Sequence, residues 1–256
     1  MAQVISIINQ KGGVGKSTTS VNMSYELAEQ KKKTLIIDLD PQAHSSCIYC
    51  EDIHKENSIN IVFENSTYSV KKLIRPAKVN GKNLDFLDII PSTIHLAMIA
   101  EGANQKIFRE KIIKKVISDV KNSYDYIVLD CQPTLGILAI NAIYASDTII
   151  IPTNFGKYSL DGISDLLQSI ESIKMDQDYK YYVLRNMYER RNSQTNKFIN
   201  QRLNETMSKY LLDTVVRKNE AINQAQINEV PVKVFNPSAN GAHDFQQLVT
   251  ELLSYV

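Results

Sequence analysis

Near its start the chain reads Lys11-Gly12-Gly13-Val14-Gly15-Lys16-Ser17-Thr18. A short apolar run at residues 4–8 precedes this stretch, and the residues from Lys16 toward Gln30 fit a helix. Glycines let the backbone bend tightly, so that successive N–H groups can point inward at phosphate oxygens. The N-terminus of the following helix adds a partial positive charge. This strand–loop–helix context predicts a phosphate-binding loop.

The side chains of the loop suit a nucleoside triphosphate with Mg²⁺. We expect Lys16 to reach the β- and γ-phosphates and the Ser17 hydroxyl to ligate the metal ion. The common template Gly-x₄-Gly-Lys-Ser/Thr fits only if Gln10-Lys11 replaces its first glycine, so the loop is a variant. The alternative, a glycine-rich turn that merely caps a helix, explains neither the two lysines nor the Ser-Thr pair. The predicted nucleotide-binding residues of the loop are Gly12, Gly13, Val14, Gly15, Lys16, Ser17 and Thr18.

Short apolar runs alternate with longer helical patterns along the rest of the chain. Most runs lack polar alternation, which is typical of strands buried on both faces. They lie at residues 4–8, 34–38, 84–90, 126–130, 148–152 and 181–185. Helical patterns lie at residues 105–121, 160–172 and 196–210, and a possible helix at 70–74. We therefore predict an α/β fold: one domain, residues 1–256, with a doubly wound, mostly parallel sheet flanked by helices.

The predicted helix at 105–121 has the clearest apolar face. Its members are Ile107, Phe108, Ile112, Val116, Ile117 and Val120. Residues at this spacing lie along one side of a helix and are expected to face the core.

Composition limits the class of protein. The chain has 256 residues, a formal net charge of +1 and three cysteines. A net charge this small attracts neither nucleic acid nor acidic lipid, so any such binding needs a local patch. The first residues lack the features of a signal peptide, and no apolar run reaches the roughly 18–20 residues that span a bilayer. An odd cysteine number suggests no disulfide framework. A cytoplasmic protein fits best.

Several motifs resemble, in order, those of the ParA/MinD group of ATPases, whose deviant Walker A loop matches residues 11–18. Asp38-Leu39-Asp40-Pro41-Gln42-Ala43 resembles the group's motif after the second strand, and residues 124–131 with Pro133 resemble its Walker B strand. Asn186-Met187-Tyr188, Val230-Pro231 and Gly241-Ala242 are similar to the ParA branch. Because the loop begins near Met1, the resemblance is to small members without an N-terminal DNA-binding extension.

The resemblance implies a P-loop fold that hydrolyses ATP and the roles of particular residues. Lys11 would cross a dimer interface to the partner's ATP, where added positive charge stabilises the reaction. Asp40 would position or deprotonate the attacking water, which makes Lys11, Lys16 and Asp40 the predicted catalytic residues. Asp38 and Asp130, with Ser17, would support the Mg²⁺ shell, and Asn186 would read the adenine edge.

The resemblance also implies partners: a homodimer formed with ATP, non-specific DNA, and a ParB-like protein that stimulates hydrolysis. Between residues 180 and 218 nine basic residues face only three acidic ones, as phosphate-backbone binding requires. Arg191 and Arg217 match the group's DNA-contacting arginines. The alternative for this segment is a solvated helical face. A protein that binds DNA in this way would be associated with the nucleoid.

Two alternatives stay open. A MinD-like regulator of division at the membrane would need a basic amphipathic helix, whereas residues 244–256 carry only Asp244 and Glu251 as charges. An iron–sulfur carrier would use Cys47 and Cys50, a CxxC pair that supplies half of a four-cysteine site. The prediction is a partition ATPase of the ParA kind.

Overall fold

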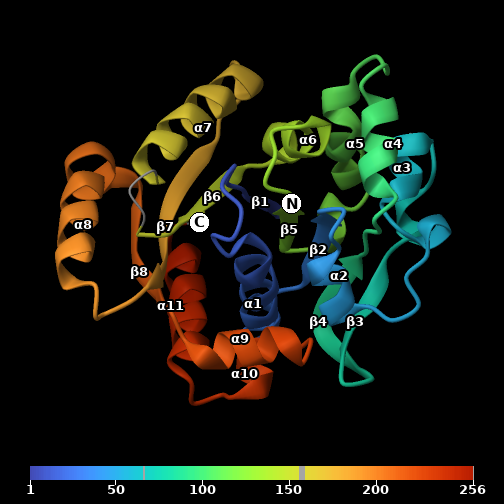
Figure 1. Cartoon of the computed structure of the whole chain (residues 1–256). Helices are drawn as coiled ribbons and strands as arrows, with labels where there is room; N and C mark the ends of the chain where they lie inside the picture. Colours follow the sequence, from blue (N-terminus) through green and yellow to red (C-terminus); the bar gives the residue numbers. More distant parts are fainter. Residues whose placement is uncertain (66, 156–158, 256) are drawn as a thin grey trace.

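The computed structural model describes residues 1–65, 67–155 and 159–255. All strands in these ranges belong to one sheet, in the order β3-β4-β2-β5-β1-β6-β7-β8 (Figure 1). The strands are β1 (Gln3–Ile7), β2 (Thr34–Leu39), β3 (Arg75–Val79), β4 (Lys82–Ile90), β5 (Tyr126–Cys131), β6 (Thr148–Thr153), β7 (Lys180–Tyr188) and β8 (Leu211–Arg217). Only β3 runs antiparallel to its neighbour, β4; the other pairings are parallel.

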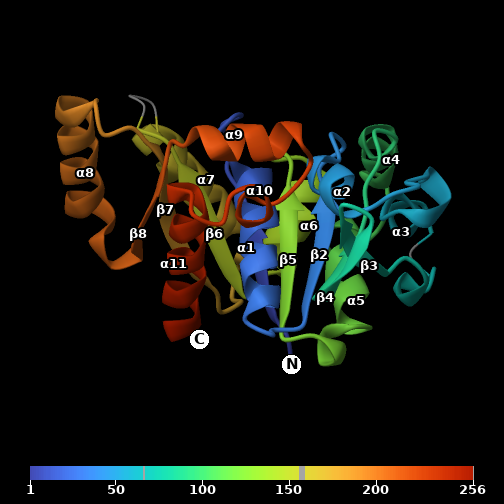
Figure 2. The same cartoon turned by 90° about the horizontal axis from the view of Figure 1, so that it is seen from below.

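Helices cover both faces of the sheet (Figures 1 and 2). On one face lie α1 (Lys16–Glu29), α2 (His44–Tyr49), α9 (Glu220–Ile227), α10 (Val232–Phe235) and α11 (Asn240–Ser254). On the other lie α3 (Asn60–Glu64), α4 (Leu96–Ala103), α5 (Ile112–Ser118), α6 (Ile137–Ala145), α7 (Ser159–Lys174) and α8 (Ser193–Met207). No helix of the described ranges is long and apolar enough to cross a membrane.

The central strands contribute to both cores. In β2, Leu35 and Ile37 belong to the core under α5 and α6, whereas Ile36 belongs to the core under α1 and α11. Alternate side chains of a strand point to opposite faces, and here both faces are buried. An uninterrupted apolar run is therefore what such a strand requires. The predicted fold class, with six of the strands, is confirmed; β3 and β8, the two edge strands, were not predicted.

The prediction of one helix over 105–121 is wrong at its start. Only α5 is regular helix, between short 3₁₀ turns at Arg109–Lys111 and Lys121–Ser123. Ile107 is 86% exposed, and Phe108 is 66% exposed with a left-handed φ of 56°. The start of α5 is instead set by Asn141 of α6, whose side chain accepts the Ile113 N–H and donates to a carbonyl in the turn before it. The helix therefore starts where a tertiary contact sets it, and the spacing of apolar residues along the sequence does not reveal that contact.

The carboxyl ends of β2, β5 and β1 meet at one edge of the sheet. β1 lies between β5 and β6, so the connections leave it on both sides, and such a switch point is where open α/β sheets bind ligands. Asp38 of β2 stands directly beside Asp130 of β5, and Asp130 in turn lies beside Ile7 of β1. The loop that follows β1 thus emerges next to two buried carboxyl groups.

Candidate functional site

The loop between β1 and α1 has a backbone that needs glycine. Gly13 and Gly15 have left-handed φ angles of 71° and 87°, which other residues adopt only at a cost. A Cβ on Gly15 would also lie 2.4 Å from Asn186 Nδ2, too close for any real contact. Gly12 differs, because its φ is not left-handed and a Cβ there would meet nothing within 4 Å. Within the described residues, neither the backbone of Gly12 nor its surroundings requires a glycine at this position.

We predict that Gly15→Ala lowers the free energy of unfolding by about 1–3 kcal/mol, because it combines left-handed strain with a clash on Asn186. Gly12→Ala is the matched control and should leave stability within about 0.5 kcal/mol, since that Cβ meets open space. Urea unfolding of the two nucleotide-free variants measures both. Equal midpoints for the two variants would contradict the assigned loop geometry.

Lys16 is the buried cation of the loop. Its residue is 6% exposed, and its Nζ donates to the Lys11 carbonyl at 3.2 Å. Burial lowers the pKa of the Lys16 ammonium, an effect that Asp130 and Asp40 partly offset by stabilising the charge. The loop therefore wraps around a positive charge already held in place before any ligand enters.

Asp38 and Asp130 form a fully buried carboxyl pair. Asp38 accepts hydrogen bonds from the N–H and the hydroxyl of Ser46, at 3.0 and 2.6 Å. Asp130 accepts from the hydroxyls of Ser45 and Ser20. Burial raises the pKa of both carboxyl groups, and Asp130 raises that of Asp38 further. The hydroxyls of Ser45, Ser17 and Ser20 act in the opposite direction on the pKa of Asp130, which ties Ser17 to the pair.

These serines were missed by the sequence analysis. Ser45 and Ser46 belong to α2, just after the Asp40 motif, and Ser20 lies one turn after Lys16. Serine is too common to mark a site by itself. The available signal was their position next to two motifs already identified.

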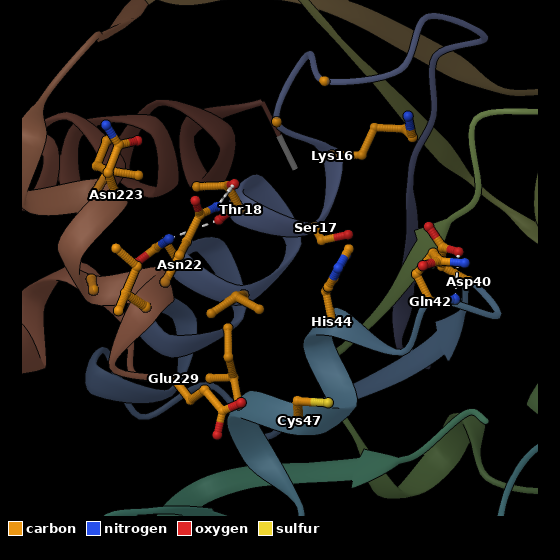
Figure 3. A pocket seen from close by; sticks show the side chains of 18 of the residues that line it. Lys16, Ser17, Thr18, Asn22, Asp40, Gln42, His44, Cys47, Asn223 and Glu229 are labelled. Atoms are coloured by element: carbon orange, nitrogen blue, oxygen red, sulfur yellow. Dashed lines mark hydrogen bonds between the residues drawn. The ribbon is translucent and has the colours of Figure 1, made fainter. Parts of the chain in front are cut away.

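Asp40 lies at the edge of the site rather than inside the carboxyl pair. It is 6% exposed, its N–H donates to Asp38, and its Oδ1 accepts the Gln42 N–H at 2.9 Å. In Figure 3 it faces the same space as Lys16 and Ser17. A carboxylate with one oxygen fixed by the backbone keeps its other oxygen available for a ligand.

A pocket of about 680 Å³ opens over these residues, a volume suited to a nucleotide. Its floor is formed by the loop and the first turns of α1, from Gly12 to Asn22. Its walls come from α2, which contributes His44 and Cys47, and from α9 and the residues after it (Figure 3). Gln226 of α9 donates to the Thr18 hydroxyl at 2.5 Å. The pocket therefore joins the predicted loop to a segment some 200 residues later.

Asn186 does not line this pocket. It is 3% exposed, its Nδ2 donates to the Val14 carbonyl at 2.8 Å, and its Oδ1 accepts the Met187 N–H. Both ends of the amide are thus used by the backbone of the loop and of β7. In this geometry Asn186 fixes the loop, and its expected contact with an adenine edge stays a prediction.

The remaining predicted residues lie apart from the buried pair. Lys11 is exposed on the rim, with its Nζ 3.0 Å from Asn154 Oδ1. Arg191 is exposed in the turn before α8. Arg217 pairs with Asp244, 2% exposed, which accepts both its Nε and its Nη2, while the Arg217 side chain stays 43% exposed; its contact with DNA stays a prediction. The guanidinium of Arg217 thus supplies the counter-charge for the buried carboxylate of Asp244.

Cys47 and Cys50 have different surroundings. Cys47 lines the pocket, whereas Cys50 Sγ lies 3.6 Å from Arg75 Nη1. Burial raises the pKa of both thiols. Within the described residues no group of three or more His, Cys, Asp or Glu side chains is placed to hold a metal ion by itself.

The site fits a nucleotide bound with Mg²⁺. The space over Gly12 and Gly13 is open, so phosphates can reach the backbone N–H groups. The oxygen-bearing set of Ser17, Asp38 and Asp130 is the kind that Mg²⁺ prefers, as it keeps several waters and takes few protein ligands. The absence of a complete protein cage is therefore expected for a metal ion that arrives with phosphates.

Comparison with known proteins agrees with this geometry. The AAA domain family matches residues 2–182. The sporulation initiation inhibitor protein Soj of Bacillus subtilis is 33% identical over 257 residues, covering 98% of both chains. The chromosome partitioning protein ParA of Myxococcus xanthus is 27% identical, over 99% of this chain and 88% of that protein. Cobyrinic acid a,c-diamide synthase of Mycobacterium smegmatis, solved with ADP and magnesium, has the same fold at 20% identity, covering 100% of this chain and 95% of that one with a TM-score of 0.82.

The family match spans most of the chain, and the first relative exceeds 30% identity over nearly all of it. Both agree with the resemblance inferred from the loop and the strand-end motifs, which is thereby confirmed. The chain belongs to the AAA domain family of P-loop ATPases and, within it, to the Soj/ParA group of partition ATPases.

Proposed function

We propose that this chain, as a single ATPase domain, drives DNA partition by switching between ATP and ADP. With ATP and Mg²⁺ it forms a homodimer that binds DNA without sequence preference. Hydrolysis, stimulated by a ParB-like protein, separates the subunits and releases the DNA. The chain would then act in the cytoplasm, on the nucleoid. The relatives named for chromosome partitioning support this proposal.

The observation that carries the proposal is the different setting of the two loop lysines. Lys16 is buried and occupies the place for a cation acting on its own chain's phosphates. Lys11 stands exposed on the rim, beside Gly12, which has open space above it. A second subunit placed on this rim would bring its own Lys11 to the bound triphosphate and would account for the glycine. ATP would then join the subunits, because each Lys11 gains its counter-charge only in the dimer.

The chain's own residues divide the work within one subunit. Lys16 and the loop N–H groups bind and orient the phosphates. Ser17, with Asp130 and Asp38 behind it, would hold Mg²⁺, which supplies positive charge to the β- and γ-phosphate oxygens. Asp40, fixed through Gln42, would orient the attacking water and accept its proton. Asn186 keeps the loop in shape through the Val14 carbonyl.

DNA binding is proposed from the exposed part of the basic segment. Two of its basic residues already have partners within the chain: the Arg185 guanidinium donates to two backbone carbonyls, and Lys218 pairs with Glu189. The exposed members within α8 and on either side of it are Arg190, Arg191, Lys197, Arg202 and Lys209. In a dimer two such patches would act on one duplex, and pairing weak sites raises affinity through effective concentration.

The direct test compares ATP with ADP. Sedimentation should give a dimer with ATP and a monomer with ADP. Fluorescence anisotropy with two unrelated duplexes should show DNA affinity at least about tenfold higher with ATP, and equal for both sequences. DNA binding that ignores the nucleotide, or an ATP-bound protein that stays monomeric, would refute the proposal.

For Arg191→Glu we predict weaker binding to every duplex alike, since backbone contacts carry no base information. Each lost phosphate contact removes about 0.9 from the slope of log affinity against log salt. The symmetric change in a dimer should therefore flatten that slope by roughly 1.8. Salt titrations of DNA binding with ATP measure it. Lys82→Glu, the same charge change at the exposed start of β4, is the control.

An unchanged slope in Arg191→Glu would mean that the segment is only a solvated face. Loss of the dimer would instead assign Arg191 to the subunit interface. Arg217 stays a predicted DNA contact, but Arg217→Glu would also face the buried Asp244 and disturb β8. Arg191 is therefore the cleaner position.

A further inference from the structure

The connection between α4 and α5 exposes apolar side chains that the nucleotide site does not use. Four large ones lie within residues 94–108 and are between 61% and 86% exposed: Ile94, Met98, Ile107 and Phe108. None of these four described residues lines the nucleotide pocket. Apolar side chains scattered singly over a surface are ordinary, whereas a group of this density marks an interaction surface.

The turn that carries Ile107 and Phe108 is fixed on both sides. The Lys106 ammonium donates to two carbonyls at the end of α3, at 2.5 and 2.6 Å. On the other side the Arg109 guanidinium donates to a carbonyl at the end of α4, and Asn141 of α6 donates to the Arg109 carbonyl. Phe108 has a left-handed φ of 56°, a strained conformation that persists only where the surrounding contacts impose it. These contacts therefore hold two apolar side chains in water.

Basic side chains surround this tip. Residues 106–115 include five basic residues and one acidic residue, in a chain whose net charge is only +1. The basic residues are Lys106, Arg109, Lys111, Lys114 and Lys115, and all except Lys106 are exposed. The Lys111 ammonium lies over the Phe108 ring, 4.9 Å from its centre. The surface is therefore apolar at its tip and positively charged around it.

This combination fits the surface of an anionic membrane. Apolar side chains that project from a turn can enter the interfacial layer, while basic side chains beside them meet lipid phosphates. A peptide is held better by a groove, but Ile107 and Phe108 are not among the residues that line the groove between α3 and α4. The connection lies at the outer end of its helical layer, away from the sheet, where a flat surface can approach it (Figure 1).

We propose that the connection between α4 and α5, residues 104–111, docks the protein on an anionic lipid surface. Ile107 and Phe108 enter the interfacial layer, and the basic side chains around them contact lipid phosphates. The protein then lies on the membrane by this tip and does not cross it. The inference goes beyond the proposed function and does not depend on it, because the tip and the nucleotide pocket share no residue.

Tryptophan fluorescence tests the insertion directly, because the chain contains no tryptophan. Emission of Phe108→Trp should shift to the blue on vesicles of equal parts phosphatidylcholine and phosphatidylglycerol, and lipids brominated along the acyl chain should quench it. Phe86→Trp is the matched control, since Phe86 is also exposed, at 46%, and also left-handed, with a φ of 62°. Its emission should not change. An unshifted Phe108→Trp, or an equal shift at both positions, would refute insertion of the tip.

Co-sedimentation of the full chain with the same vesicles measures affinity. Affinity should be at least about tenfold lower for phosphatidylcholine alone, since two basic residues beside an anionic surface already contribute that much. Phe108→Asn should lower affinity for the mixed vesicles at least about fivefold, as withdrawal of a partly buried ring would give. Phe86→Asn should bind normally, and asparagine tolerates the left-handed backbone at both positions. Arg191→Glu should also bind normally, because it changes the segment proposed for DNA.

Each other outcome overturns the proposal. Equal binding to both lipid compositions would remove the role of the basic side chains. If Arg191→Glu loses as much vesicle binding as Phe108→Asn, the vesicles are bound as a polyanion by the DNA segment. If polyglutamate binds as tightly as the mixed vesicles and Phe108→Asn weakens both equally, the tip serves an acidic protein partner. A wild type that stays in the supernatant with both lipid compositions would refute docking outright.

Discussion

In Asp40→Ala, ATP turnover should fall by at least about 100-fold while ATP affinity stays within about threefold of the wild type. Positioned general bases contribute roughly 10²–10⁴ to rates, so removing one should leave little hydrolysis. Asp40 is suited to this role because it lies beside Lys16 in the pocket and the backbone of Gln42 fixes one of its oxygens. Binding should survive, since the loop N–H groups and Lys16 remain.

Phosphate release and ATP binding should be measured on the same preparation, together with oligomer size. Because ATP would persist, the variant should stay dimeric for longer than the wild type. Asp40→Asn keeps the acceptor for the Gln42 N–H but loses the negative charge, and should be nearly as slow. Gln42→Ala keeps its backbone N–H and is the control for local disturbance. Near-normal turnover in Asp40→Ala would remove Asp40 from the reaction.

The parts of this site that could be predicted from the sequence are those fixed locally. The tight bend of the loop could be predicted at Gly13 and Gly15, which have left-handed φ angles, because glycine adopts this backbone conformation without the cost that other residues have. Asp38 and Asp130 could each be placed at a strand end, because each follows an apolar run and a charged side chain does not fit the buried middle of such a strand. That the two stand side by side follows only from the parallel pairing of β2 with β5.

The parts that could not be predicted depend on contacts between distant segments. Gln226 and Thr18 are 208 residues apart, and Asn186 and Val14 are 172 apart. No local pattern marks either pair. Arg217 illustrates the same limit. A charge count over residues 180–218 leaves out Asp244, which lies in α11 and forms a salt bridge with the Arg217 guanidinium. Periodicity likewise could not place Phe108, whose helix start is set from α6 by Asn141.

The two lysines of the loop should separate binding from dimerisation. Lys16→Ala should weaken ATP about 100-fold, because it removes a charged contact to the phosphates and leaves the buried Asp38–Asp130 pair without its nearby cation. Lys11→Ala should keep ATP affinity within about threefold, since its ammonium stands on the exposed rim of its own subunit. The same variant should lose the ATP-dependent dimer, and with it most turnover.

Isothermal titration with ATP and sedimentation with ATP or ADP measure the two effects separately. Gly12→Val adds a bulky side chain where the single chain offers only open space, so it should bind ATP, keep its stability and fail to dimerise. Agreement between Lys11→Ala and Gly12→Val would locate the interface on this rim, because one change removes a charge and the other adds bulk, and both would act only against a second subunit. A Lys11→Ala protein that dimerises normally would show that the lysine does not cross between subunits. If instead it loses ATP as completely as Lys16→Ala, Lys11 acts on its own chain's phosphates, and another group must join the subunits.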